Sequence, residues 1–151
     1  MNVSTKRIRI KLGSAIALAE LLEDEAPRTC ALIWKQLPMT GKTGHSMESG
    51  REVFVEVRKN LRPEPENRTI YQIPGDVVFY LKPILLPLIG RERPVISFIY
   101  DRDSQIRGPK GPIPVNLFAR IVEGLPRLSQ ESVRMRQQGF KPAVIEKPEG
   151  I

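Results

Sequence analysis

The alternation of apolar and polar residues predicts short β-strands along most of the chain. Residues 6–12 switch between basic side chains and Ile or Leu, the period of two that marks a half-buried strand. Gly13-Ser14 then predicts a hairpin turn, and residues 15–22 predict the returning strand. Further strands are predicted at 53–57, 70–73, 77–80, 95–100 and 116–122, with a short one around Val144.

Two segments instead carry the period of an α-helix. Residues 27–37 begin with Pro27, which suits the first position of a helix. Apolar side chains recur there at i, i+3, i+4 and i+7, namely Cys30, Ile33, Trp34 and Leu37. Cys30 is therefore predicted to pack in the core and not to act as a nucleophile. The second helix is predicted at 124–138, ended by Gly139. Its predicted inner face consists of Leu125, Leu128, Ser132 and Met135.

The remaining segments, at 60–68, 83–94 and 101–114, are rich in proline and predict loops. Proline is excluded from helix interiors and central strands, and the chain holds 14 of them. Many short strands with one helix early and one late are typical of an all-β barrel carrying two helices. The length of 151 residues suits a single domain over 1–151, with a core at about 7–140 and a C-terminal tail at 141–151.

Charge and composition limit the classes of partner. The net charge is +7, but basic residues are scattered among acidic ones and no aromatic side chains interleave with them, so no specific nucleic-acid site is predicted. No run reaches the roughly 18 apolar residues of a transmembrane helix, so no membrane segment is predicted. The single cysteine excludes an internal disulfide and favours a cytoplasmic location. One cysteine and one histidine exclude metal sites built on several of them, and neither a metal nor an organic cofactor is predicted.

Three segments resemble the cyclophilins. Residues 25–30, Glu-Ala-Pro-Arg-Thr-Cys, resemble the start of a cyclophilin helix, residues 117–125 resemble the ending Val-Phe-Gly-x-Val-x-x-Gly, and residues 74–80 resemble the Pro-Gly strand. Over residues 7–140 the chain is more closely similar to a prokaryotic cyclophilin-like family of unknown function. The order and spacing of short motifs carry this resemblance, among them Gly41-Lys42 with His45, Glu66-Asn67 and Asn116-x-Phe118. It implies a closed cyclophilin-like β-barrel of about eight strands with two helices capping it.

The resemblance does not carry isomerase activity with it. Cyclophilins isomerise X-Pro bonds with an arginine that directly follows a histidine, whereas this chain reads Gly44-His45-Ser46. The histidine is kept and the arginine is missing, so loss of prolyl isomerase activity is predicted. Peptidyl-prolyl isomerisation stays open as an alternative function.

The polar stretch 40–54 holds the only histidine of the chain and predicts a site for a small polar metabolite. A histidine titrates near neutral pH, so His45 paired with Glu52 is predicted to hold and move a proton. Ligand-binding roles are predicted for Ser46, Ser49, Asn67, Tyr71 and Tyr80. The simpler interpretation, in which His45 only caps local backbone groups and Glu52 is solvated, stays open.

The sequence leaves open whether the chain is an enzyme. The predicted function is to bind or convert a small-molecule ligand or substrate in a groove around His45. A non-catalytic module that binds protein or forms a homo-oligomer is the other alternative, because the apolar segment 84–89 would require a partner if exposed.

Overall fold

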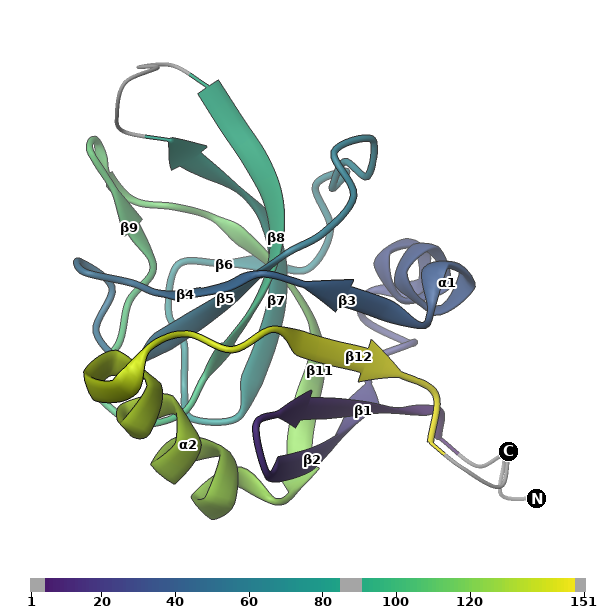
Figure 1. Cartoon of the computed structure of the whole chain (residues 1–151). Coiled ribbons are helices and arrows are strands. Elements are labelled where there is room, and N and C mark those ends of the chain that lie inside the picture. The colour runs from purple at the N-terminus through teal and green to yellow at the C-terminus, as the bar shows by residue number, and fades with distance from the viewer. Residues whose placement is uncertain (1–4, 85–90, 149–151) are drawn as a thin grey trace.

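The computed structural model describes residues 5–84 and 91–148 (Figure 1). Residues 85–89, most of the apolar segment 84–89 on which the assembly hypothesis rests, therefore lie outside the described residues. The helices are α1 (Pro27–Gln36) and α2 (Leu125–Gln138). The strands are β1 (Arg7–Leu12), β2 (Ala15–Leu21), β3 (Met39–Gly41), β4 (Thr43–His45), β5 (Glu52–Glu56), β6 (Arg68–Thr69), β7 (Asp76–Ile84), β8 (Arg91–Ile99), β9 (Arg107–Gly108), β10 (Gly111–Pro112), β11 (Val115–Glu123) and β12 (Ala143–Glu146).

Ten of these strands form one antiparallel sheet. Its order is β3-β12-β1-β2-β11-β7-β8-β5-β4, and the short β6 pairs with β11 beside this path. Strands β9 and β10 form a separate two-stranded ladder. The fold is thus mainly β with two helices, as the alternation pattern predicts.

The prediction of a closed barrel is not supported. The strand order has two ends, β3 and β4, and no ladder joins them in the described part of the chain. Both ends nevertheless belong to one extended stretch, because only Lys42 separates β3 from β4, and the backbone N–H of Glu56 donates to the Lys42 carbonyl at 2.8 Å. The sheet therefore curves until its two edges are consecutive pieces of the same segment.

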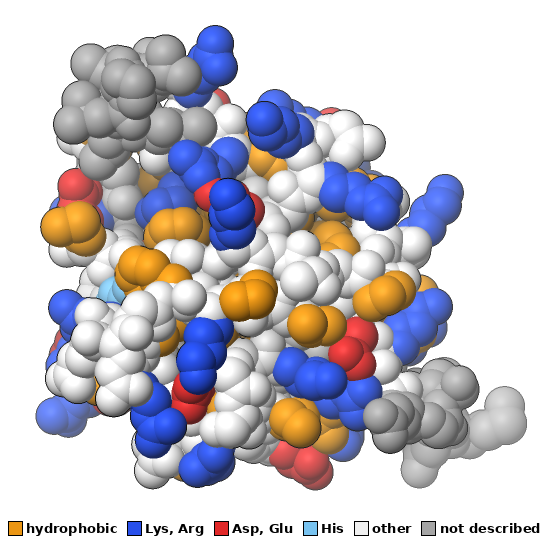
Figure 2. Space-filling view, viewed as in Figure 1, with side chains coloured by type: hydrophobic (Ala, Val, Ile, Leu, Met, Phe, Trp, Pro, Cys, Tyr) orange, Lys and Arg blue, Asp and Glu red, His pale blue; other side chains and the backbone are white. Residues whose placement is uncertain are grey.

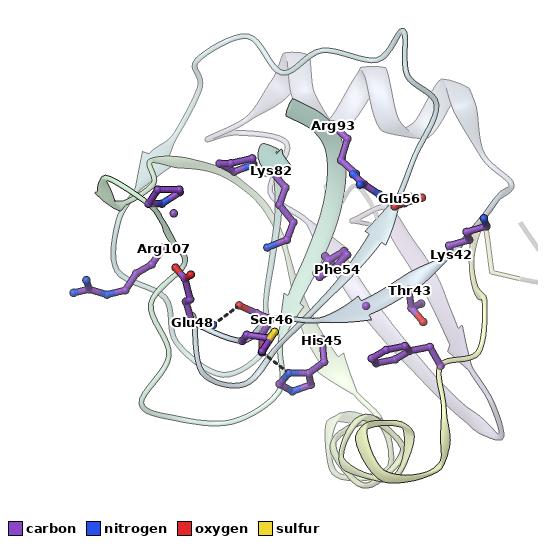
Figure 3. Close-up of a pocket in the computed structure, with 16 residues that line it drawn as sticks. Lys42, Thr43, His45, Ser46, Glu48, Phe54, Glu56, Lys82, Arg93 and Arg107 are labelled. Carbon is purple, nitrogen blue, oxygen red and sulfur yellow. Dashed lines mark hydrogen bonds and ion pairs between the residues drawn. The ribbon is translucent and has the colours of Figure 1, made fainter. Parts of the chain in front are cut away.

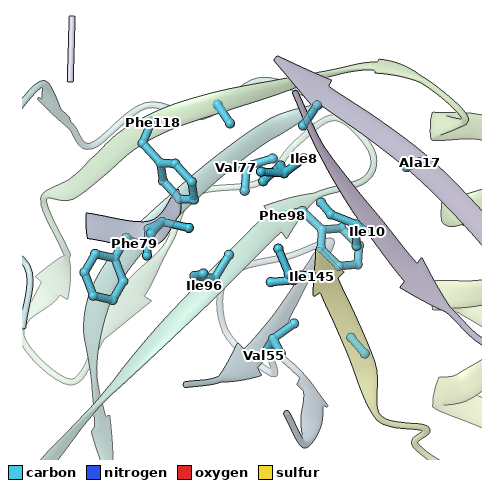
Figure 4. Packing of buried hydrophobic residues seen from close by; sticks show 14 of the residues in the cluster. Ile8, Ile10, Ala17, Val55, Val77, Phe79, Ile96, Phe98, Phe118 and Ile145 are labelled. Carbon is cyan, nitrogen blue, oxygen red and sulfur yellow. The ribbon is translucent and has the colours of Figure 1, made fainter. Parts of the chain in front are cut away.

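Side chains on the inner face of the curved sheet form the main core. Ile8 and Ile10 from β1, Phe98 from β8 and Phe118 from β11 are at most 1% exposed and converge there (Figure 4). The alternation that predicts β1 from the sequence places its Ile and Leu residues in this core, and its basic residues on the other face.

The two helices pack on the sheet as their periodicity predicts. Cys30 and Ile33 of α1 are buried in the main core, and Trp34 and Leu37 pack against it. Burial raises the pKa of the Cys30 thiol to about 12, so the sulfur stays protonated, which agrees with the predicted packing role. In α2 the predicted inner face is confirmed: Leu128, Ser132 and Met135 are buried, and Leu125 is partly buried.

Some sequence predictions of elements are wrong. Residues 70–73 form no strand, because their backbone bonds to side chains: the Ile73 N–H donates to Asp76 Oδ2 at 2.9 Å. Of the predicted loop at 83–94, the described residues 83–84 and 91–94 instead belong to the paired strands β7 and β8, in which Leu81 pairs with Pro94. The proline is tolerated because it lies one residue beyond the last β5–β8 pair, where β8 has a ladder on one side only.

Neither helix of the described chain combines the length and the apolar character that crossing a membrane would require.

Candidate functional site

Strands β5, β7 and β8 carry a second buried layer on the face turned away from the main core, here called the outer face. Val53 and Val55 of β5 point to the main core, so the alternate residues Glu52, Phe54 and Glu56 point to the outer face. A second hydrophobic cluster covers this face: Val78, Tyr80, Val95 and Ile99 from β7 and β8 and Val115 and Leu117 from the adjacent β11 pack with Ile106 of the segment before β9. The outer face therefore lies beneath the segment that carries β9 and β10.

A cavity of about 530 Å³ opens beside this cluster (Figure 3). Its lining comes from β4 and the following turn, from β5, from the β7–β8 hairpin, from the β9–β10 segment and from the chain after α2. The lining residues are Lys42, Thr43, Gly44, His45, Ser46, Met47, Glu48, Phe54, Glu56, Lys82, Pro83, Arg93, Arg107, Gly108, Pro109 and Phe140. Five stretches of sequence thus converge on one space.

Gly44 and Phe54 form the floor of the cavity. They pair directly across the β4–β5 ladder, and the Phe54 ring lies over Gly44. A Cβ atom at position 44 would stand 2.2 Å from the Phe54 Cζ atom, so only glycine lets the ring lie flat on the strand. The Lys82 ammonium lies 4.6 Å from the centroid of the same ring, a cation–π contact.

Ser46 and Ser49 build the turn that closes one side of the cavity. Ser46 Oγ accepts hydrogen bonds from the backbone N–H groups of Glu48 and Ser49, at 3.3 and 2.9 Å. Ser49 Oγ accepts from the Arg107 N–H at 3.0 Å, and the Ser49 carbonyl accepts from the Gln105 N–H at 3.0 Å. Of the two serines with predicted ligand-binding roles, Ser46 lines the cavity, while Ser49 is buried and holds the β9–β10 segment in place.

His45 is half-buried, and both of its ring nitrogens are engaged by the protein. Nδ1 lies 2.7 Å from the Ser46 carbonyl oxygen, which can only accept, so Nδ1 carries the hydrogen. Nε2 of the neutral ring then accepts from the Tyr100 hydroxyl at 2.6 Å. Figure 3 shows the ring pointing away from Phe54 and Lys82, toward α2. His45 thus contributes to the wall of the cavity, with its ring turned toward Tyr100.

The pKa of His45 is lowered by burial. His45 therefore binds a proton more readily in the unfolded chain than in the folded one. It leaves the stability of the fold unaffected well above pH 6.5 and reduces that stability as pH falls below about 6.5. Because His45 is the only histidine, its imidazole resonances are unambiguous in NMR spectra. We expect an NMR titration to give a pKa below 6.5; a midpoint at or above that value would contradict the buried, neutral ring.

Glu52 and His45 are not brought together. His45 lies opposite Val53, so Glu52, the residue before Val53 in β5, points to the other face of the sheet. Glu52 is fully buried, its Oε2 accepts from the Tyr80 hydroxyl at 2.6 Å, and its Oε1 has no hydrogen-bond partner among the described residues. The predicted His45–Glu52 proton pair is therefore absent from the structure, and Glu52 and Tyr80 form a buried pair of their own.

The other predicted ligand-binding residues lie away from the cavity lining. Asn67 adopts a left-handed backbone with φ of 46°, and its Nδ2 donates to the Leu117 carbonyl at 2.9 Å. Tyr71 is 76% exposed on the segment before β7. Neither residue lines the cavity. No group of three or more His, Cys, Asp or Glu side chains in residues 5–84 and 91–148 is arranged as a metal site.

Comparison with protein families gives a match, over residues 8–145, to a family described as "Protein of unknown function (DUF3830)". The chain belongs to the DUF3830 family. Membership of a family of unknown function agrees with the resemblance found in the sequence, while the family's description names no cyclophilin. A search of curated proteins finds no match for this DUF3830 chain.

Two solved structures share the fold of this DUF3830 protein. "Structure of McbB in complex with tryptophan" matches with a TM-score of 0.70 and 13% identity, over 95% of this chain and 45% of McbB. The chain therefore spans less than half the length of McbB. A solution structure of the hypothetical protein AF2241 from Archaeoglobus fulgidus matches with a TM-score of 0.58 and 22% identity, over 95% of both chains.

Sequence reasoning missed most of the residues that line the cavity of the DUF3830 chain. Phe54 carried a usable signal, because it alternates with the valines of its strand and must face the other side of the sheet. Lys82 is a single charge directly after an apolar strand, a weaker signal of the same kind. Arg107 and Phe140 carried none, since only the fold brings the β9–β10 segment and the chain after α2 to this place.

Proposed function

We propose that this protein binds a small metabolite in the cavity over Phe54, on a cyclophilin-like fold. The observation that carries the proposal is the cavity itself, formed where five stretches of sequence meet. Its volume of about 530 Å³ lies within the range of roughly 300–1,000 Å³ that small-molecule sites occupy. Such sites combine apolar walls with a few polar groups, and this lining has both.

The cyclophilin-like part of the proposal rests on the sequence motifs and on the course of the sheet. The two edge strands β3 and β4 are consecutive in the chain, so one extended segment carries both edges of the curved sheet. McbB, a structure that shares the fold, is described as a complex with tryptophan. This chain covers only part of McbB, so the position of that ligand does not transfer. The tryptophan complex of McbB supports a small-molecule site as the class of function, but it assigns no role to any single residue of this chain.

Binding is better supported than conversion of a substrate. The catalytic proposal needs a proton-transferring group that faces the ligand, and both nitrogens of His45 are already engaged by Ser46 and Tyr100. Glu52 lies outside the cavity lining and bonds Tyr80. Roles for His45 and Glu52 in catalysis would require these contacts to break when a substrate arrives.

A thermal-shift screen against a metabolite library tests the proposed function. A ligand that binds only the folded protein stabilises it by about 2.7 kcal/mol at a hundredfold excess over its dissociation constant. We expect at least one compound to raise the melting temperature of the wild type and of Tyr71→Ala, an exposed aromatic residue outside the lining, but not of Phe54→Ala. A library without any stabilising compound, or one whose compounds stabilise Phe54→Ala equally, would contradict the proposal.

We further expect no prolyl isomerase activity. The position of the cyclophilin arginine is Ser46, whose Oγ is bonded to the backbone of its own turn. Of the two arginines in the lining, Arg93 is paired with Glu56. Refolding of a substrate protein limited by a slow X-Pro step should proceed at its uncatalysed rate in the presence of the protein. Acceleration that increases with protein concentration would contradict this expectation.

A further inference from the structure

The charged side chains of the cavity are unbalanced in favour of cations. Four cationic residues line it, Lys42, Lys82, Arg93 and Arg107, against two carboxylates, Glu48 and Glu56. Burial lowers the pKa of His45, so that the ring adds no charge at neutral pH. The lining therefore carries two net positive charges, and a concave site with apolar walls focuses such a potential on a ligand.

Lys82 is the cation best placed to meet a ligand. Arg93 is paired with Glu56, whereas Lys82 and Arg107 have no carboxylate within ion-pair distance in the described part of the chain. Figure 3 shows the Lys82 side chain extending into the space between Phe54 and Glu48. It is half-buried, with its ammonium over the Phe54 ring. A partly desolvated ammonium without a counterion gains most from a bound anion.

The walls around Lys82 are apolar and require a ligand with a carbon body. The lining includes Phe54, Pro83 and Pro109, together with the exposed side chains of Met47 and Phe140. An inorganic anion would leave these surfaces unused. Phosphate sites are commonly built on helix N-termini, and neither Pro27 nor Leu125, where α1 and α2 begin, contributes to the lining.

We propose that the ligand is a small organic carboxylate whose apolar body packs on Phe54 and whose carboxylate meets Lys82, with Arg107 as a second cationic contact. This inference rests on the proposed function and specifies its ligand class. Glu48, the carboxylate of the lining that has no ion-pair partner among the described residues, opposes the anion and sets how strongly it is held.

Four probes that share an aromatic body and differ in charge test the inference: 3-phenylpropionate, its primary amide, 3-phenylpropylamine and phenyl phosphate. Each is titrated into the ¹⁵N-labelled protein, and the amide shifts of residues 44–48, 54 and 82 are followed. We expect saturable shifts with 3-phenylpropionate and at least about tenfold weaker binding of the amide and the amine, since a charge-assisted hydrogen bond is lost.

Charge variants locate the anion contact. Lys82→Met should weaken 3-phenylpropionate binding by about tenfold or more. Lys59→Met makes the same charge change at an exposed position outside the lining and should leave binding unchanged, while Glu48→Gln should tighten it. Melting temperatures of all variants confirm that they are folded.

The outcomes separate this inference from the proposed function. If the amide, the amine or the phosphate binds at these residues as tightly as the carboxylate, or if Lys82→Met binds like the wild type, the carboxylate inference is overturned and the small-molecule site stands. If no probe of any charge shifts the cavity amides up to its solubility limit, the inference is overturned and the proposed function is weakened with it.

Discussion

Replacing Glu66 by Gln is expected to destabilise the protein by about 3 kcal/mol at neutral pH. Glu66 caps the first turn of α1 from 37 residues away: Oε1 accepts from the Thr29 N–H and hydroxyl, each at 2.7 Å, and Oε2 accepts from the Arg28 N–H at 3.1 Å. Burial alone would raise its pKa, but these hydrogen bonds lower the pKa of Glu66 to about 2. The difference from the ordinary value of 4.5 corresponds to about 3 kcal/mol for the ionised form.

The pH dependence of this effect has a definite sign. A carboxylate with a depressed pKa in the folded state contributes its full stability above about pH 4.5 and loses it as pH falls toward 2. Urea unfolding of the wild type and Glu66→Gln should therefore differ most near pH 7 and converge near pH 2. Glu64→Gln, an exposed neighbour, is the matched control and should follow the wild type. A constant difference across this pH range would contradict the capping role.

Replacing Tyr80 by Phe is expected to cost about 2–3 kcal/mol, because it leaves the fully buried Glu52 carboxylate without its only hydrogen-bond donor among the described residues. Burial and the neighbouring carboxylate raise the pKa of Tyr80 well above its ordinary value, so the hydroxyl stays protonated and donates. Equilibrium unfolding in urea measures the loss of stability.

Two further variants define the origin of that cost. Tyr71→Phe removes a hydroxyl from a residue that is 76% exposed and should change stability by less than about 0.5 kcal/mol. Tyr80→Phe combined with Glu52→Leu removes both polar partners and should recover part of the stability lost in the single variant. A double variant less stable than Tyr80→Phe would show that Glu52 has a role other than accepting this hydrogen bond.

The sequence predicted those elements that a local pattern of residues, read along the chain, is enough to define. The alternation of residues 6–12 and the apolar stripe of α1 are local patterns, and both are present in the structure. The predicted strand at 70–73 is wrong because side chains of Asp76, Thr69 and Gln105 bond its backbone groups, which a period of two does not reveal. The pairing of β7 with β8 around Pro83 and Pro94 was missed. Each of these prolines lies in a part of its strand that pairs with a neighbouring strand on one side only, where proline is tolerated.

The candidate site was predicted only where it coincides with a polar stretch. His45 and Ser46 line the cavity, but the sequence does not show that β4 and β5 pair so that Gly44 lies opposite Phe54. The motif Glu66-Asn67, which carried part of the family resemblance, connects the start of α1 to β11 and serves the fold. A motif alone does not distinguish such a structural contact from a ligand contact.

The basic side chains are dispersed over the face of the molecule that Figure 2 shows. Figure 2 shows Lys and Arg side chains spread over one face among acidic and apolar ones, not gathered in a single patch. Several are paired, such as Arg7 with Glu20 at 3.1 Å and Arg9 with Glu146 at 2.6 Å. The ligand class proposed above rests instead on the local cationic excess in the cavity lining.

A crystal structure of the protein with the compound that stabilises it most would test the central claim most directly. We predict electron density for the ligand inside the cavity, in contact with the Phe54 ring and with residues 44–46. A ligand bound elsewhere on the protein, with the space over Phe54 filled only by solvent, would contradict it.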